Sequence, residues 1–378
     1  MGERKEYKLA DVAIDFAMGP FGSNIKAENF IESGVPVIRG KNLNFYKYVG
    51  GDFVCLSDEK ADELKKSNCF PNDLVFTHRG TIGQVGLIPK GKYPRYVVSQ
   101  SGMKLTVDKN KLDENYLFYF FKSDIGQYEL LKNESQVGVP AISSPLSSLK
   151  SVDLTLPPLP EQKAIASVLS SLDDKIDLLH RQNKTLEAMA ETLFRQWFVE
   201  EAQKDWEIVK LDSLINISSG KGLKKEHLSE NGAYPVLGAN GEIGRTNEFL
   251  FNESLLFTGR VGTLGNIFRV ENEKVWLSDN TLVIKPKNYF NFIYFVLKTA
   301  KLEEYNVGST QPLIRQSDIK EIEISLPSEN KLHEFEKESD LLLNKIRQNK
   351  SQIRTLEKLR NTLLPKLIRG EVRVNYEN

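Results

Sequence analysis

The most constraining feature of this sequence is an internal duplication with a constant spacing. Residues 137–194 align without a gap to residues 307–364, at an offset of 170. Identical residues recur along the whole alignment, among them Lys150 with Lys320, Leu156-Pro157 with Leu326-Pro327, and Thr185-Leu186-Glu187 with Thr355-Leu356-Glu357. A repeat that keeps one spacing over this length indicates two copies of one structural unit, so it decides the architecture before any motif is considered.

Upstream of this constant segment, the two copies differ in length. The offset falls from 202 at Lys8-Leu9, through 199 at Pro36-Val37, to 182 where GTIG (80–83) meets GTLG (262–265). Each copy is therefore a variable domain followed by a constant segment. Length changes confined to the variable domain are expected if each copy binds something different.

Composition and charge exclude several classes of protein. The 378 residues are 40% hydrophobic and 10% aromatic, enough for two or three folded domains and unlike a disordered chain. The apolar runs are far shorter than the ~20 residues of a membrane span, and the start, MGERKEYKLA, lacks a signal-peptide core, so we expect a soluble, cytoplasmic protein. Two cysteines and four scattered histidines provide neither a disulfide framework nor a metal motif. Lys+Arg and Asp+Glu are both 51, so bulk charge does not indicate nucleic-acid binding, although it permits a local basic surface.

The constant segments are predicted to be long helices. Pro160 and Glu161 suit the first turn of one helix, and Ser328 suits the N-cap of the other. Apolar residues then recur in steps of three and four, which is the heptad pattern of a coiled coil. In the first helix this pattern comprises Ile165, Leu169, Leu172, Ile176, Leu179, Asn183, Leu186, Ala190, Leu193 and Trp197, and in the second Phe335, Ser339, Leu342, Ile346, Asn349, Ile353, Leu356, Arg360, Leu363 and Leu367.

One asparagine in each seam predicts the register of the pair. If the helices pack antiparallel with Asn183 facing Asn349, the seam pairs Leu179 with Ile353 and Trp197 with Phe335, and nearly every layer is apolar. Only Leu172/Arg360 and Leu193/Ser339 break this pattern, and Pro365 is expected to kink or end the second helix. A buried Asn pair costs stability but fixes alignment. The alternative is that both amides point to solvent.

The variable domains are predicted to be mixtures of strands, loops and short helices. Residues 36–42, 73–88 and 97–107 in the first domain, and 235–244, 254–270 and 276–286 in the second, resemble strands and turns, while 116–121 and 292–297 resemble core helices. Both domains carry GxxGxxG, at Gly80, Gly83, Gly86 and at Gly259, Gly262, Gly265. This spacing suits tight turns, either close to a phosphate or without any ligand. Neither copy matches a nucleotide-binding motif.

Basic and amide side chains cluster beside these turns. Arg is suited to the guanine O6/N7 edge, and Asn or Gln to the adenine N6/N7 edge. Each of these residues also fits an ordinary surface role, and the interpretation as DNA contacts depends on their recurrence in both copies. The candidates are Arg39, Lys41, Asn42, His78, Arg79, Gln100, Lys221, Lys224, Asn240, Arg245, Arg260 and Asn280.

The constant segments carry a family resemblance. LPPLPEQKAIASVLSSLDDKI (156–176), ETLFRQWFVE (191–200) and TLLPKLIRGEVRV (362–374), together with the duplicated layout, resemble the specificity subunit of type I restriction-modification systems. The resemblance covers essentially the whole chain and is weaker in the variable domains. The start of the second helix, LPSENKLHEF (326–335), lacks the family's PPLxEQ pattern. Because members of this family bind methyltransferase subunits, the departure puts one contact with such a subunit in doubt.

The resemblance implies an α+β fold with a pseudo-twofold internal repeat, in which two mixed α/β target-recognition domains are separated by two long antiparallel coiled-coil helices. The expected segments are recognition domain 1 (1–157), long helix 1 (158–203), recognition domain 2 (204–327), and long helix 2 with the C-terminal tail (328–378).

The same resemblance implies the partners and their cofactors. Each recognition domain reads half of an asymmetric bipartite site in double-stranded DNA, and the coiled coil sets the gap. Two methyltransferase subunits use S-adenosylmethionine, and restriction subunits use ATP and Mg²⁺. This chain itself is expected to bind no cofactor or metal and to catalyse nothing, and it contains no [DNS]PP[YFW] or Walker A motif. The alternatives are a scaffold with two β-rich protein- or glycan-binding modules, and an enzyme acting at the glycine turns.

Overall fold

A computed structural model describes residues 3–44, 47–135, 138–262, 264–308 and 312–375. Val137, at the start of the repeat, and Thr263, in the second glycine turn, lie outside the described residues. The chain forms two compact units. The first unit comprises Met1–Leu179 and Ser351–Asn378, and the second comprises His180–Lys350.

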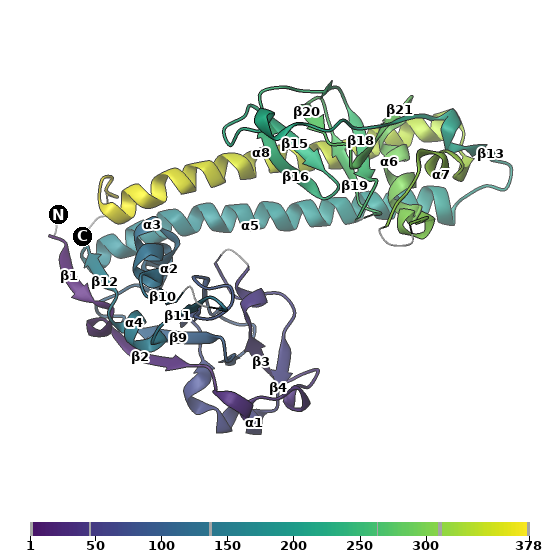
Figure 1. Cartoon of the computed structure of the whole chain (residues 1–378). Helices are drawn as coiled ribbons and strands as arrows, with labels where there is room; N and C mark the ends of the chain where they lie inside the picture. Colours follow the sequence, from purple (N-terminus) through teal and green to yellow (C-terminus); the bar gives the residue numbers. More distant parts are fainter. Residues whose placement is uncertain (1–2, 45–46, 136–137, 263, 309–311, 376–378) are drawn as a thin grey trace. The chain divides into compact units, whose positions relative to one another are not determined.

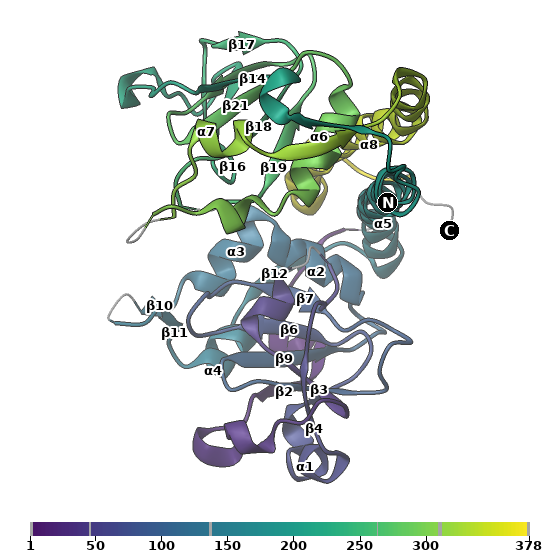
Figure 2. The ribbon, with the colours of Figure 1, turned by 90° about the vertical axis from the view of Figure 1, so that its right-hand side faces the viewer.

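The first unit contains two four-stranded sheets. One is antiparallel, with strand order β2-β9-β6-β7, and Figure 2 shows these strands as neighbours. The other, β4-β3-β8-β5, pairs β3 with β8 in parallel. Two-stranded sheets join β1 to β12 and β10 to β11. The strands are β1 (Lys5–Lys8), β2 (Ala13–Met18), β3 (Val35–Ile38), β4 (Val54–Leu56), β5 (Asn68–Cys69), β6 (Leu74–Thr77), β7 (Val85–Leu87), β8 (Tyr96–Val98), β9 (Gly102–Val107), β10 (Glu134–Ser135), β11 (Ala141–Ile142) and β12 (Asp153–Leu156).

Four short helices complete the first unit. They are α1 (Asp58–Glu63), α2 (Glu114–Lys122), α3 (Asp124–Leu131) and α4 (Pro145–Lys150). Asp113 caps α2 by accepting hydrogen bonds from the backbone of Asn115 and Tyr116. The apolar run predicted as a core helix is buried throughout in α2, where it packs on the first sheet and on the first long helix. Figure 1 and Figure 2 both show α2 next to that long helix.

The second unit repeats both four-stranded sheets and the β1–β12 pair of the first, but its described residues contain no counterpart of the β10–β11 pair. Its sheets have the orders β14-β21-β18-β19 and β16-β15-β20-β17, with β15 and β20 parallel, and β13 pairs with β22. The segments 97–107 and 276–286 each contain two strands, as predicted, but the two strands belong to different sheets. The elements are β13 (Glu207–Lys210), β14 (Ile215–Ser219), β15 (Tyr234–Gly238), β16 (Gly241–Thr246), β17 (Phe251–Asn252), β18 (Leu255–Gly259), β19 (Ile267–Val270), β20 (Lys274–Leu277), β21 (Thr281–Pro286), β22 (Glu323–Leu326), α6 (Phe290–Thr299) and α7 (Gln316–Lys320). The α+β class and the internal repeat are therefore confirmed.

The constant segments form the helices α5 (Leu159–Arg195) and α8 (Glu329–Arg369). In the second unit, Asn349 Nδ2 donates a hydrogen bond to Asn183 Oδ1 at 2.9 Å, and the rings of Trp197 and Phe335 lie 6.2 Å apart. In the first unit, Leu179 and Ile353 belong to one buried cluster. The antiparallel register is confirmed, and the alternative in which both amides point to solvent is wrong.

The two irregular layers have different explanations. In the first unit, Asp173 rather than Leu172 is buried, and it accepts hydrogen bonds from Arg360 Nη1 at 3.1 Å and Tyr119 Oη at 2.5 Å. In the second unit, Ser339 accepts a hydrogen bond from Asn291 Nδ2 of α6 at 3.0 Å. The seam is thus polar where a recognition domain packs on a helix, because buried polar groups need partners.

The sequence predicts that Pro365 kinks or ends the second helix, but α8 does not end there. The helix continues to Arg369, and Leu364, Leu367 and Ile368 are buried in the core of the first unit. The Arg4 guanidinium donates hydrogen bonds to the carbonyl oxygens of Ile368 and Leu367 at 2.5 and 3.1 Å. Packing and this cap hold the last turn despite the missing N–H of proline.

Candidate nucleic-acid interface

In the first unit, three chain segments meet at the turn 99–102, which connects β8 to β9. Ser99 N donates to the carbonyl oxygen of Ile38 at the end of β3, and His78 N, just after β6, donates to Ser101 O, both at 2.9 Å. Gly19, just after β2, donates to Gly102 O at 2.9 Å. These backbone hydrogen bonds bring the ends of β2, β3 and β6 together at one edge of the unit.

The second unit builds the same frame from different residues. Ser278 N donates to Leu237 O at 2.9 Å, Arg260 N to Asn280 O at 2.8 Å, and Gly220 N to Thr281 O at 3.1 Å. The turn 278–281 therefore corresponds to 99–102, and Arg260 corresponds to His78. Because the backbone supplies these three hydrogen bonds in each unit, the side chains at the turn can differ between the two units.

The glycine turns lie next to this frame. Gly80 and Gly83 have φ of +83° and +81°, and Gly262 and Gly265 have +85° and +89°, a region that side chains rarely adopt. Gly80 N donates to Pro140 O at 2.9 Å, and Gly262 N to Pro312 O at 3.0 Å. Gly80 corresponds to Gly262, and Gly83 corresponds to Gly265. The third glycines do not correspond, because Gly86 lies in β7 and Gly259 at the end of β18.

The predicted residues of the first unit divide by exposure. Lys41, Arg79 and Gln100 are exposed, and Arg39 is half-buried. Asn42 is buried, with its amide donating to Gly50 O and Asp52 O and accepting from Arg39 N, so it stabilises the loop and has no group left for a base. His78 is also buried, with Nε2 3.2 Å from Gln100 O, and burial lowers its pKa. A neutral imidazole in this position supports the turn.

The predicted residues of the second unit divide in the same way. Lys221, Lys224, Asn240, Arg260 and Asn280 are exposed. Arg245 instead donates to the carbonyl oxygens of Gly232 and Ala233 and to the Glu242 carboxylate, at 2.7 to 3.0 Å, and so holds the β15–β16 hairpin to the preceding loop. Of the predicted residues in this unit, Asn280 on the turn and Arg260 at the end of β18 are placed together, because Arg260 N donates to Asn280 O.

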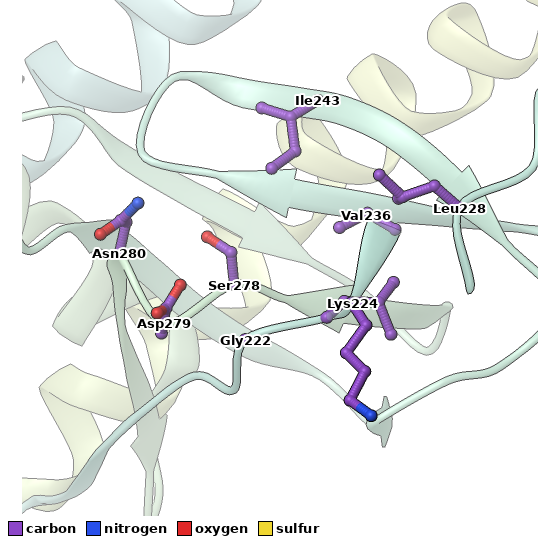
Figure 3. A pocket seen from close by; sticks show the side chains of 9 residues that line it. Gly222, Lys224, Leu228, Val236, Ile243, Ser278, Asp279 and Asn280 are labelled. Carbon is purple, nitrogen blue, oxygen red and sulfur yellow. The ribbon is translucent and has the colours of Figure 1, made fainter. Parts of the chain in front are cut away.

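A hollow of about 480 Å³ adjoins the turn of the second unit. Figure 3 shows Ser278, Asp279 and Asn280 of the turn on one side of it, and Leu228, Val236 and Ile243 on the other. Of the residues that line this hollow, Lys224 and Asn280 were predicted from the sequence, and Asp279 and the apolar side chains were not. The sequence could have indicated Asp279, because it stands next to Asn280 in the same turn. It could not have indicated the apolar residues, because an apolar residue in a strand can equally well face the core.

The described residues show neither a metal cluster nor a membrane-spanning helix. They contain no group of three or more His, Cys, Asp or Glu side chains placed to hold a metal ion. Every helix in the described ranges is too short or too polar to cross a lipid bilayer.

Comparison with known proteins decides the family. The family model described as the type I restriction modification DNA specificity domain matches residues 3–188 and 203–358. This chain belongs to that family. The two matched stretches correspond to the two copies of the repeat, and the resemblance inferred from the constant segments is confirmed.

Relatives match this member of the specificity family over most of its length. The MjaIX type I restriction enzyme specificity subunit of Methanocaldococcus jannaschii is 28% identical, over 92% of this chain and 89% of the relative. A putative type I specificity subunit of Mycoplasma genitalium is 26% identical, over 91% of both. The crystal structure of a type I restriction-modification S subunit from M. genitalium has a TM-score of 0.65, with 21% identity over 99% of this chain and 97% of that one, and so shares the fold.

Proposed function

We propose that this chain is the DNA-reading subunit of a type I restriction-modification complex, and that each unit reads one half of an asymmetric, split DNA site. The observation that carries the proposal is the repeated frame at the turns 99–102 and 278–281 with different side chains on it. A shared backbone frame aims side chains in the same way in both units. Different side chains on it, such as Gln100 and Asp279, select different bases.

Exposed cations at these edges support binding to the DNA backbone. Arg79 in the first unit and Lys221, Lys224 and Arg260 in the second are exposed beside the turns. Lysine and arginine contacts to phosphate position a protein on DNA, while contacts to base edges specify the sequence. A formal net charge of zero is compatible with this role if partner subunits supply most of the nonspecific affinity.

The long helices are proposed to set the gap and to hold the partners. At 1.5 Å per residue, α5 and α8 have lengths of about 56 and 62 Å. Leu178 and Leu359 in the first unit, and Met189 and Leu341 in the second, are 41 to 64% exposed on these helices and offer apolar contacts to another protein. We propose that two methyltransferase subunits dock along this surface, and that restriction subunits join through them.

The proposed division of labour follows the segments expected from the sequence. Residues 1–157 and 204–327 read DNA, while 158–203 and 328–378 form the spacer. Chemistry is assigned to the partners, with S-adenosylmethionine bound by the methyltransferase and ATP with Mg²⁺ by the restriction subunit.

The proposal is tested by coexpressing the chain with the methyltransferase subunit of its own locus and mapping N6-methyladenine across the host genome. We expect methylation at a split, asymmetric motif with a fixed gap. A matched strain that expresses the methyltransferase alone should show no such motif. A stable complex that methylates no split site would refute the role in DNA reading.

A further inference from the structure

The hollow beside the turn 278–281 combines features that select one kind of base. Its apolar wall includes Val236, which is buried, and Leu228 and Ile243, which are 42% and 62% exposed. Exposed apolar side chains gathered at a hollow on a binding edge indicate contact with a ligand. The opposite wall of the hollow is polar and includes Ser278, Asp279 and Asn280.

Asp279 is the acidic side chain on that wall. It is exposed, and no described residue donates a hydrogen bond to its carboxylate or forms an ion pair with it. One carboxylate oxygen lies 3.5 Å from the point that a Cβ on Gly222 would occupy, so the carboxylate lies over the segment that also carries Lys221 and Lys224. If this edge meets DNA, the phosphates repel an unneutralised carboxylate, because both are negatively charged. Such a carboxylate favours binding only where it accepts a hydrogen bond from the DNA.

The donors available in the major groove limit the choice of base. A carboxylate only accepts hydrogen bonds, and the base-edge donors there are the N4 amino group of cytosine and the N6 amino group of adenine. Adenine places its N7 acceptor beside N6, where it repels the second carboxylate oxygen. Cytosine places its C5–H edge beside N4, and an apolar wall accommodates that edge.

We propose that Asp279 selects cytosine in the half-site read by the second unit, by accepting a hydrogen bond from N4 while Leu228, Val236 and Ile243 flank the C5 edge. This inference rests on the proposed function and deepens it. In the first unit, the corresponding residue of the turn is Gln100, whose amide both donates and accepts and therefore suits adenine N6 and N7. The same turn position thus reads different bases in the two halves of the site.

The experiment uses the purified complex with its methyltransferase subunit, after the split motif has been mapped. Each cytosine in both half-sites is replaced in turn by a 2-pyrimidinone nucleotide, which lacks only the 4-amino group. We expect one replacement to weaken binding by the wild-type complex roughly 5- to 150-fold, the range for one base contact. The same replacement should change binding by the Asp279→Ala complex less than about twofold, because the acceptor for the amino group is already absent.

A second variant and a control complete the test. Asp279→Asn should shift the preference at this one position towards adenine, because an amide pairs with N6 and N7. Glu207→Gln removes one exposed negative charge from β13, outside the turn, and should leave every base preference unchanged.

The outcomes separate this inference from the function on which it rests. A wild-type complex that reads a split site but is insensitive to every cytosine replacement would overturn the assignment of Asp279 alone. Equal effects of the replacement on wild-type and Asp279→Ala complexes would also overturn it. A wild-type complex that reads no split site would overturn the proposed function, and this inference with it.

Discussion

Replacing Arg360 with methionine tests the buried ion pair that joins α8 to α5 and α2 in the first unit. Arg360 Nη1 lies 3.1 Å from Asp173 Oδ1, and the two side chains are 9% and 5% exposed. Methionine keeps much of the side-chain volume but removes the guanidinium from the buried Asp173 carboxylate, which keeps its hydrogen bond from the Tyr119 hydroxyl. Removing one partner of a buried pair costs about 3–5 kcal/mol of unfolding free energy.

Thermal unfolding followed by far-ultraviolet circular dichroism measures this loss. For a unit of this size, 1 kcal/mol corresponds to about 2–4 °C, so we expect Arg360→Met to lower the unfolding temperature of the first unit by roughly 6–20 °C. Lys358→Met is the matched control, because Lys358 is exposed on the same helix. Its expected effect is within about 0.5 kcal/mol.

The loss should also depend on pH. Burial raises the pKa of Asp173, and its hydrogen bonds to Tyr119 and Arg360 oppose that rise, so removal of Arg360 raises the pKa further. A carboxyl group with a higher pKa in the folded than in the unfolded protein favours folding at acidic pH, and this contribution is lost as the pH rises through the folded-state pKa. The deficit of Arg360→Met should therefore shrink from about pH 8 to about pH 5. A variant no less stable than Lys358→Met, or a deficit that does not change with pH, would refute this reasoning.

Three further predictions concern the interface and the spacer. Gly220→Ala should destabilise the second unit and abolish reading of its half of the DNA motif, because a Cβ there would lie 2.2 Å from Ser278 O. Gly222→Ala is the matched control and should unfold at the wild-type temperature, because its Cβ would make ordinary contacts of at least 3.5 Å. Arg79→Ala should relax or abolish reading of one half-site and Arg260→Ala that of the other, and wild-type methylation maps for both would contradict their placement at the interface. Insertion of one heptad into each of α5 and α8 should widen the gap by about 10 Å, or about three base pairs, or abolish methylation; an unchanged gap in the methylation map would contradict the role of the helices as a ruler.

Sequence periodicity predicted the helices well because their packing is local and regular. The pair Asn183/Asn349 fixed the register, since every neighbouring layer is then apolar. The exceptions arose where recognition domains pack on the helices. Asp173 is polar and lies outside the heptad seam, but Tyr119 from α2 and Arg360 from α8 make it a buried residue. No helical pattern contains that information, because the partner on α2 comes from a distant part of the chain.

The interface was harder to predict because residue type does not reveal where a side chain points. Asn42 and Arg245 have the chemistry of base readers, yet both use their polar groups to hold loops. Asp279, which we propose as a base reader, was not predicted because a search for cations and amides passes over a carboxylate. The alignment of the two copies by backbone hydrogen bonds, which the sequence does not contain, identified the turn that carries it.

The first unit is built from both ends of the chain, and this has a consequence for synthesis. Its core includes Leu364, Leu367 and Ile368, and Arg4 caps the helix that carries them. The second unit is continuous, from His180 to Lys350. On the ribosome, residues 3–179 therefore have to wait for the segment after residue 350 before their core closes, while the second unit has all its residues earlier. The part of the protein made first is completed last, and the apolar surface that Leu364, Leu367 and Ile368 cover stays open to chaperones and proteases for that interval.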